Sequence, residues 1–69
     1  MRDAFHRELE TLDQAIVRMG ALVEQSTRMA TTALLECDRE LAQKVREGDD
    51  EIDALFLDIE TRALTLLAQ

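Results

Sequence analysis

Asp49 and Asp53 are the two residues whose type and spacing come closest to a chemical site. Residues four positions apart are neighbours on one face of an α-helix, where two carboxylates repel each other by roughly 0.2–0.5 kcal/mol. Ligand sets made only of oxygen suit Mg, Ca, Mn or iron better than zinc. Two carboxylates are too few for a firm metal site, so further ligands must come from another helix. The alternative is a solvated acidic face that continues through Asp50 and Glu51.

The other reactive residues give no catalytic pattern. Glu60 follows Asp53 by seven positions, so it either adds a ligand or pairs with a nearby arginine. Glu24 is interpreted as a flanking charge. His6 has no second histidine or cysteine pair near it, as a metal site would require, and it is interpreted as a surface residue. Cys37 has no nearby base to activate it as a nucleophile. We therefore expect that the protein is not an enzyme.

The composition is typical of long helices. The 69 residues include no proline, two glycines and two aromatic residues, Phe5 and Phe56. Alanine, leucine, glutamate and arginine, which favour helices, are abundant. A chain this short forms one domain at most and buries a small core. Without disulfides or metal, such a chain usually needs a partner for firm stability.

The charge balance excludes two classes of partner. Eight basic and 15 acidic residues give a net charge of −7. Nucleic acids and anionic membranes both require a cationic face, so we expect neither as a partner. No apolar run approaches 18 residues, so we expect no insertion into a membrane. A single cysteine and a charged N-terminal segment without an apolar core predict a cytoplasmic protein.

Apolar residues that recur every three or four positions predict a first helix over about 3–36. Its expected core positions are Phe5, Leu9, Leu12, Ile16, Met19, Val23, Ser26, Ala30, Ala33 and Cys37. Leu22, Met29 and Leu34 widen the apolar stripe beyond a two-stranded contact. A stripe of this width favours a bundle of three or four helices.

A break in this pattern predicts a turn at about 37–38, with Asp38 as the N-cap of a second helix over about 39–68. The expected core positions of the second helix are Leu41, Val45, Gly48, Ile52, Leu55, Ile59 and Leu66. Glycine inside a helix costs about 1 kcal/mol relative to alanine. Folding the chain back places Gly48 opposite the small residues between Ser26 and Ala30, so we expect close packing there. The predicted fold is all-α, an antiparallel hairpin of two long helices.

Several short motifs, in order along the chain, resemble the N-terminal part of the PhoU family. They include F-x-x-E-L at 5–9, M-G-x-L-V-E at 19–24, A-L-x-x-x-D at 33–38, L-A-x-x-V at 41–45, D-x-x-I-D at 49–53 and L-x-L-L-A at 64–68. Each motif alone is ordinary helix sequence, but their order and spacing together are specific. The resemblance covers nearly the whole chain.

The resemblance implies a fold and a role. PhoU-like proteins consist of two tandem three-helix repeats and act as negative regulators of phosphate uptake and of phosphate-starvation signalling. They contact a Pst-type phosphate transporter and a sensor histidine kinase. Several bind divalent metal or iron clusters through paired E/D-x-x-x-D motifs, and Asp49 and Asp53 match one such motif. The third helix of a repeat has no counterpart in these 69 residues. The sequence is then a truncated form, a fragment, or a short relative that rebuilds the bundle by self-association. The predicted fold is a PhoU-like bundle that lacks the third helix and is completed by self-association.

Two alternatives to a PhoU-type regulator remain open. One is a structural oligomerisation hairpin, a dimeric four-helix bundle without a ligand. The other is a di-metal bundle enzyme, which the absence of a Glu-x-x-His motif makes the weakest of the three. We expect the regulator, as a homo-oligomer that acts through protein contacts.

Overall fold

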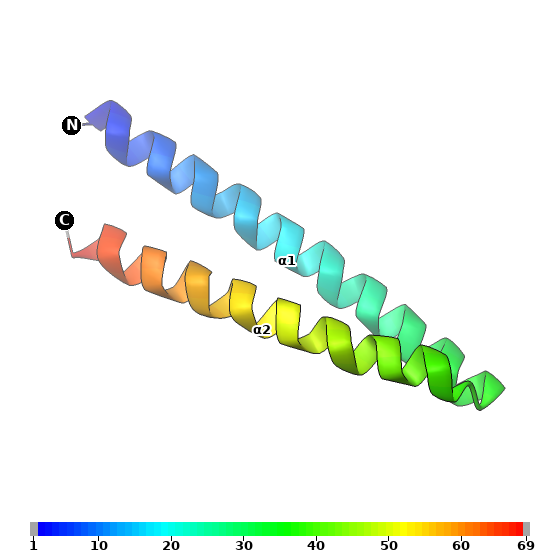
Figure 1. Cartoon of the computed structure of the whole chain (residues 1–69). Coiled ribbons are helices and arrows are strands. Elements are labelled where there is room, and N and C mark those ends of the chain that lie inside the picture. Colours follow the sequence, from blue (N-terminus) through cyan, green and yellow to red (C-terminus); the bar gives the residue numbers. More distant parts are fainter. Residues whose placement is uncertain (1, 69) are drawn as a thin grey trace.

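The computed structural model describes residues 2–68, which form two helices joined by a short turn. Helix α1 spans Arg2–Glu36 and helix α2 spans Arg39–Leu67, against expected ranges of about 3–36 and 39–68. The helices run antiparallel, with both termini at one end and the turn at the other (Figure 1). The predicted all-α hairpin is confirmed.

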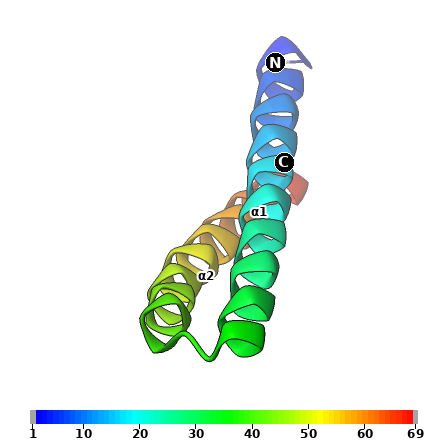
Figure 2. The same cartoon turned by 90° about the vertical axis from the view of Figure 1, so that its right-hand side faces the viewer.

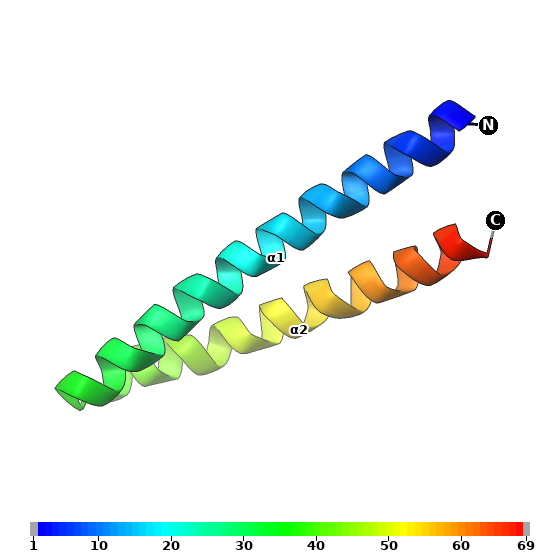
Figure 3. The same ribbon diagram turned by 180° about the vertical axis from the view of Figure 1, so that it is seen from behind.

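The hairpin is long and thin. Its principal extents are 53 × 15 × 12 Å, and its radius of gyration is 15.9 Å. A compact domain of this length has a radius of gyration of about 11 Å. The views in Figures 2 and 3 show two helices side by side, with no third layer of described chain against either. Within residues 2–68, neither helix is long and apolar enough to cross a membrane.

The turn is a Schellman motif with cysteine in the position that usually holds glycine. The N–H of Asp38 donates to the carbonyl oxygen of Ala33 at 2.9 Å, and the N–H of Cys37 donates to that of Leu34 at 3.4 Å. This geometry requires a left-handed residue, and Cys37 has φ 52°. A side chain with a Cβ is disfavoured in this conformation.

Asp38 is the N-cap of α2, as predicted. Its backbone is extended, with φ −92° and ψ 102°. A carboxylate oxygen of Asp38 accepts a hydrogen bond from the N–H of Leu41 at 3.0 Å. The motif that ends α1 and the cap that begins α2 together satisfy backbone groups at both helix ends across only two residues.

The core of the single chain is small and lies between the helices. Its buried side chains are Leu12, Ala33, Ile59 and Leu66. Leu12, Ile59 and Leu66 form one cluster near the open end, against which partly buried residues pack, namely Ala15, Met19, Leu55 and Ala63. With so few buried residues, packing within one chain contributes modestly to stability.

The predicted core positions of α2 all face α1, but those of α1 divide into two groups. The expected positions on α2, Leu41, Val45, Gly48, Ile52, Leu55, Ile59 and Leu66, are buried or half-buried. On α1, Leu12 is buried and Met19 and Ala30 are half-buried. As core positions of the single chain, four residues of α1 are predicted wrongly, because they are exposed, namely Phe5, Leu9, Ile16 and Val23.

The reason is that the apolar pattern of α1 combines two heptad columns. Leu12, Met19 and Ser26 follow one another by seven and face α2, whereas Leu9, Ile16 and Val23 follow one another by seven beside them. Helix α2 covers the column of Leu12 and leaves the column of Leu9 exposed.

The expectation for Gly48 is half right. Gly48 lies opposite Ser26 and Met29, and these residues line a cavity of about 160 Å³. A Cβ added at Gly48 would have no neighbouring atom within 4 Å. The close packing that was expected to explain this glycine is therefore wrong, since the small side chains leave a hollow and do not draw the helices together.

Replacement of Gly48 by alanine should therefore stabilise the protein. We expect Gly48→Ala to raise the free energy of unfolding by about 1 kcal/mol, because alanine restricts the unfolded chain and favours the helix. Urea unfolding followed by circular dichroism at fixed protein concentration measures this. Gly20→Ala is the matched control, since Gly20 also has open space around it. Stabilisation by Gly20→Ala together with destabilisation by Gly48→Ala would restore the close-packing explanation.

The left-handed residue in the turn gives a second prediction. We expect Cys37→Gly to raise the free energy of unfolding by about 1 kcal/mol, because glycine adopts this conformation without the Cβ penalty. Cys37→Ser keeps the Cβ and removes the thiol, so its stability should match that of the wild type. An equal gain in both variants would show that the thiol, and not the backbone, is responsible.

Candidate functional site

Asp49 and Asp53 lie near the middle of α2, and both are exposed. Their separation of four residues on a continuous helix places them on the same face. Within residues 2–68, the ion pairs lie elsewhere: Arg28 pairs with Glu24, and Arg62 pairs with Asp58 at 3.3 Å. Among the described residues, neither of the two neighbouring carboxylates therefore has an ion-pair partner.

The part of the chain that the structure describes does not complete a metal site around this pair. Among the described residues, no group of three or more His, Cys, Asp or Glu side chains could hold a metal ion. Mg²⁺ and Ca²⁺ take six or more ligands, and two carboxylates supply only part of that shell. Asp49 and Asp53 thus remain a predicted half-site, whose other ligands would have to come from a different segment or chain.

The remaining candidates are spread along the hairpin. Glu24 is an exposed surface charge that pairs with Arg28. Glu60 is exposed on α2, while the nearby Arg62 pairs with Asp58. The ring of His6 meets that of Phe5 edge to face, with 6.1 Å between centroids. Cys37 is an exposed, free thiol at the turn, at the opposite end of the molecule. His6 and Cys37 therefore cannot act together.

A larger feature is a second apolar face beside the helix–helix contact. We define the second apolar face as two columns of residues that each repeat every seven positions. The columns are Leu9, Ile16, Val23 and Ala30 on α1, and Ala42, Asp49, Phe56 and Ala63 on α2. Its large members Leu9, Ile16, Val23 and Phe56 are 45–49% exposed.

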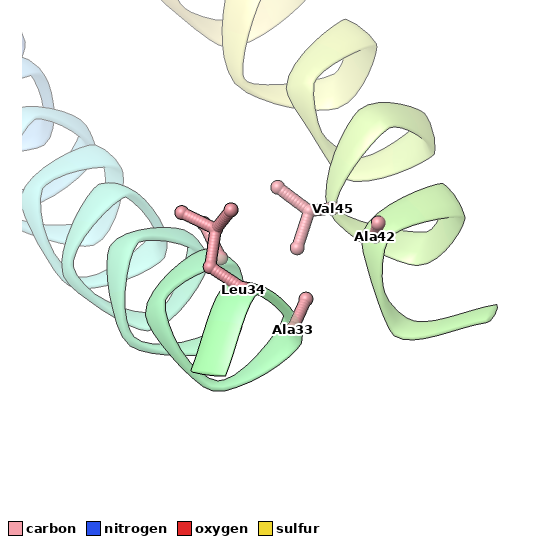
Figure 4. Close-up of a pocket in the computed structure, with 5 residues that line it drawn as sticks. Ala33, Leu34, Ala42 and Val45 are labelled. Carbon is pink, nitrogen blue, oxygen red and sulfur yellow. The ribbon is translucent and has the colours of Figure 1, made fainter. Parts of the chain in front are cut away.

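The two columns lie on the same side of the hairpin. At the turn end they meet at an apolar cavity of about 210 Å³, lined by Ala30, Ala33, Leu34, Ala42 and Val45. Figure 4 shows Ala33 and Leu34 of α1 across from Ala42 and Val45 of α2. Since Ala30 ends one column and Ala42 begins the other, both columns extend from this cavity toward the open end.

Asp49 belongs to the second apolar face, and Asp53 lies at its edge, one turn before Phe56. The acidic pair is therefore placed beside an apolar surface that a further helix would fit. Reasoning from the sequence found the carboxylates and the wide stripe but assigned Leu9, Ile16 and Val23 to the core. The spacing of seven shows that α1 has two apolar columns, but it does not tell which of them faces α2, because the column of Leu12 and Met19 has the same spacing.

Comparison with known proteins identifies a family. The model of the PhoU domain matches residues 16–69, which include the turn, all of α2 and the acidic pair. The chain belongs to the PhoU family. This confirms the resemblance drawn from the sequence motifs.

Several curated relatives carry the name of phosphate-specific transport system accessory protein PhoU or its homologue. The relative from Pseudomonas putida is 40% identical over 65 residues, which are 94% of this chain and 25% of that protein. The relative from Synechocystis sp. is 41% identical over 66 residues, 96% of this chain and 30% of that protein. The protein from Escherichia coli K12 is 32% identical over 65 residues, 94% of this chain and 27% of that protein. The chain thus spans about a quarter of the length of these relatives. No solved structure matches the chain significantly.

The half-site predicts weak but specific cation binding. We expect Mn²⁺ to bind the 69-residue chain with a dissociation constant of about 10⁻³ M or weaker, because two carboxylates supply only part of a shell whose weakest complete calcium examples have constants of about 10⁻⁴–10⁻³ M. Electron paramagnetic resonance of free Mn²⁺ measures the constant. Asp49→Asn with Asp53→Asn should weaken binding at least about tenfold, because both oxygen ligands lose their charge.

The control has the same change in net charge. Asp50→Asn with Glu51→Gln removes two exposed carboxylates that lie off the second apolar face. An equal loss in both double variants would show diffuse attraction to an acidic chain instead of a half-site.

Proposed function

We propose that this PhoU-family chain is a regulatory module of phosphate homeostasis and not an enzyme. In this role it lowers phosphate uptake and the phosphate-starvation response by contacting a Pst-type transporter and a sensor histidine kinase on their cytoplasmic sides. The observation that carries the proposal is the family match over residues 16–69, together with relatives named as accessory proteins of phosphate-specific transport.

The features of the hairpin support action by contact. Its candidate reactive residues are dispersed, whereas the second apolar face offers large exposed side chains such as Ile16 and Phe56. Exposed apolar patches of this kind, bordered by polar residues, mark protein interaction sites. The net charge of −7 suits partners with basic surfaces.

The proposal includes a metal ion that modulates the packing of a further helix on the second apolar face. If further ligands join Asp49 and Asp53 when a helix covers the second apolar face, a divalent cation or an iron cluster would offset the repulsion between these carboxylates. Metal binding at Asp49 and Asp53 would then depend on whether a further helix completes the bundle.

The alternative is a ligand-free oligomerisation hairpin. The observation that favours it is the small core, which leaves Leu9, Ile16, Val23 and Phe56 exposed in the single chain. A hairpin of this kind would gain stability from a partner helix without any role in phosphate regulation.

Two measurements together test the regulatory role: repression of a phosphate-starvation reporter by the chain, and direct binding of the chain to the transporter or the kinase. In a bacterial strain that lacks its PhoU-family regulator, we expect expression of the chain to lower a phosphate-starvation reporter at least about threefold in phosphate-rich medium. In surface plasmon resonance, the purified chain should bind the immobilised cytoplasmic portions of the transporter or kinase at about micromolar concentration. Leu12→Asp, which places a charge in the buried cluster, is the unfolded control.

The contrary result is a chain that is folded by circular dichroism, yet neither binds these portions nor changes the reporter. That combination would favour the ligand-free hairpin.

A further inference from the structure

We infer that a second copy of this chain covers the second apolar face, in an antiparallel, two-fold arrangement that gives a four-helix bundle. The inference stands apart from the proposed regulatory role, because it rests on surface area and on the distribution of side-chain size along the hairpin.

Surface area shows how much of the chain lacks cover. The hairpin exposes 5804 Å². A compact monomer of this size exposes about 4,400 Å², so the excess is roughly 1,400 Å². Each partner in a standard, stable interface buries roughly 800 Å². The excess is larger than this, so the uncovered surface is enough for a stable interface with one further copy, and the second apolar face is long enough for both helices of that copy to pack on it.

The size of the side chains gives the relative direction of the two copies. At the open end of the hairpin, Leu9 of the second apolar face is bulky and exposed. At the turn end, Ala30 and Ala42 are small, and together with Ala33 they border the cavity of about 210 Å³. A parallel pair would place bulky residues against bulky residues and alanines against alanines.

An antiparallel pair places the bulky end of each copy over the cavity of the other. Leu9 of the second copy then lies near Ala30, and the reciprocal contact follows from the two-fold axis. The midpoint between these contacts lies near the centre of both helices. Phe56 is within one turn of the middle of α2 (Arg39–Leu67), so the two copies of Phe56 meet close to the axis. Aromatic rings at such a position contribute more than their buried area alone.

Sedimentation of matched variants tests whether this face pairs. Ile16 and Val17 are adjacent, β-branched and exposed, but only Ile16 belongs to the second apolar face. At an ionic strength of about 0.15 M, where charges beyond about 8 Å are screened, we expect the wild-type chain to form a dimer in analytical ultracentrifugation. Ile16→Asp should weaken the dimer at least about a hundredfold, because a charge would be buried without a partner, whereas Val17→Asp should leave it unchanged.

The native cysteine tests the direction. Cys37 is exposed at the turn, and it is the one cysteine of the chain. A spin label on each Cys37 should give a distance of about 50 Å in the antiparallel dimer, since about 35 helical residues separate the two turns. A short distance, near 20 Å or less, would indicate the parallel pair.

Four outcomes would overturn the inference. They are a folded monomer at every concentration, a higher oligomer, a dimer that Ile16→Asp and Val17→Asp affect equally, and a dimer with the short label distance. Circular dichroism of both variants excludes unfolding as the cause of a monomer.

Discussion

Each helix of this protein carries apolar residues over a wider arc than one neighbouring helix can cover, and the stability of the hairpin depends on this constraint. The contact between α1 and α2 buries Leu12, Ile59 and Leu66, yet it leaves Ile16 and Phe56 nearly half exposed. One neighbouring helix covers a limited arc, and apolar residues outside that arc require another helix. The hairpin is therefore a partial bundle, and its stability depends on whatever packs on the second apolar face.

The two-residue turn sets the register that makes the second apolar face continuous. Cys37 and Asp38 hold the helices so that Ala30 and Ala42 border the same cavity. One additional residue at the start of α2 would rotate the helix by about 100° and move Asp49 and Phe56 away from the column of Leu9, Ile16 and Val23. The strained backbone of Cys37 and the cap at Asp38 thus determine which side chains can meet a partner.

The helices, the turn and the packing face of α2 could all be predicted from the sequence. The packing face of α2 was predictable because a charged residue marks the column that does not belong to the core. On α2, Asp49 interrupts the second column, so the column through Val45, Ile52 and Ile59 is the one that fits a core. On α1 both columns are apolar, and nothing in the spacing distinguishes Leu12 and Met19 from Leu9 and Ile16. Gly48 shows a similar limit, because small residues on facing helices are compatible with close approach or with a hollow, and only the structure distinguishes these two arrangements.

The acidic pair and the incomplete core are linked through the same surface. Any helix that covers Ile16 and Phe56 also approaches Asp49, and removal of water from a carboxylate is costly unless a charge or a metal compensates for it. The covering segment must therefore make apolar contacts along the columns. It must also bring a positive charge or a metal near the middle of α2 to compensate for the dehydrated carboxylate. Since the relatives are about four times as long as this chain, they contain further segments that could do both. A second copy of the hairpin supplies the apolar contact readily, whereas Asp49 and Asp53 gain a cation only if that copy also brings oxygen ligands to them.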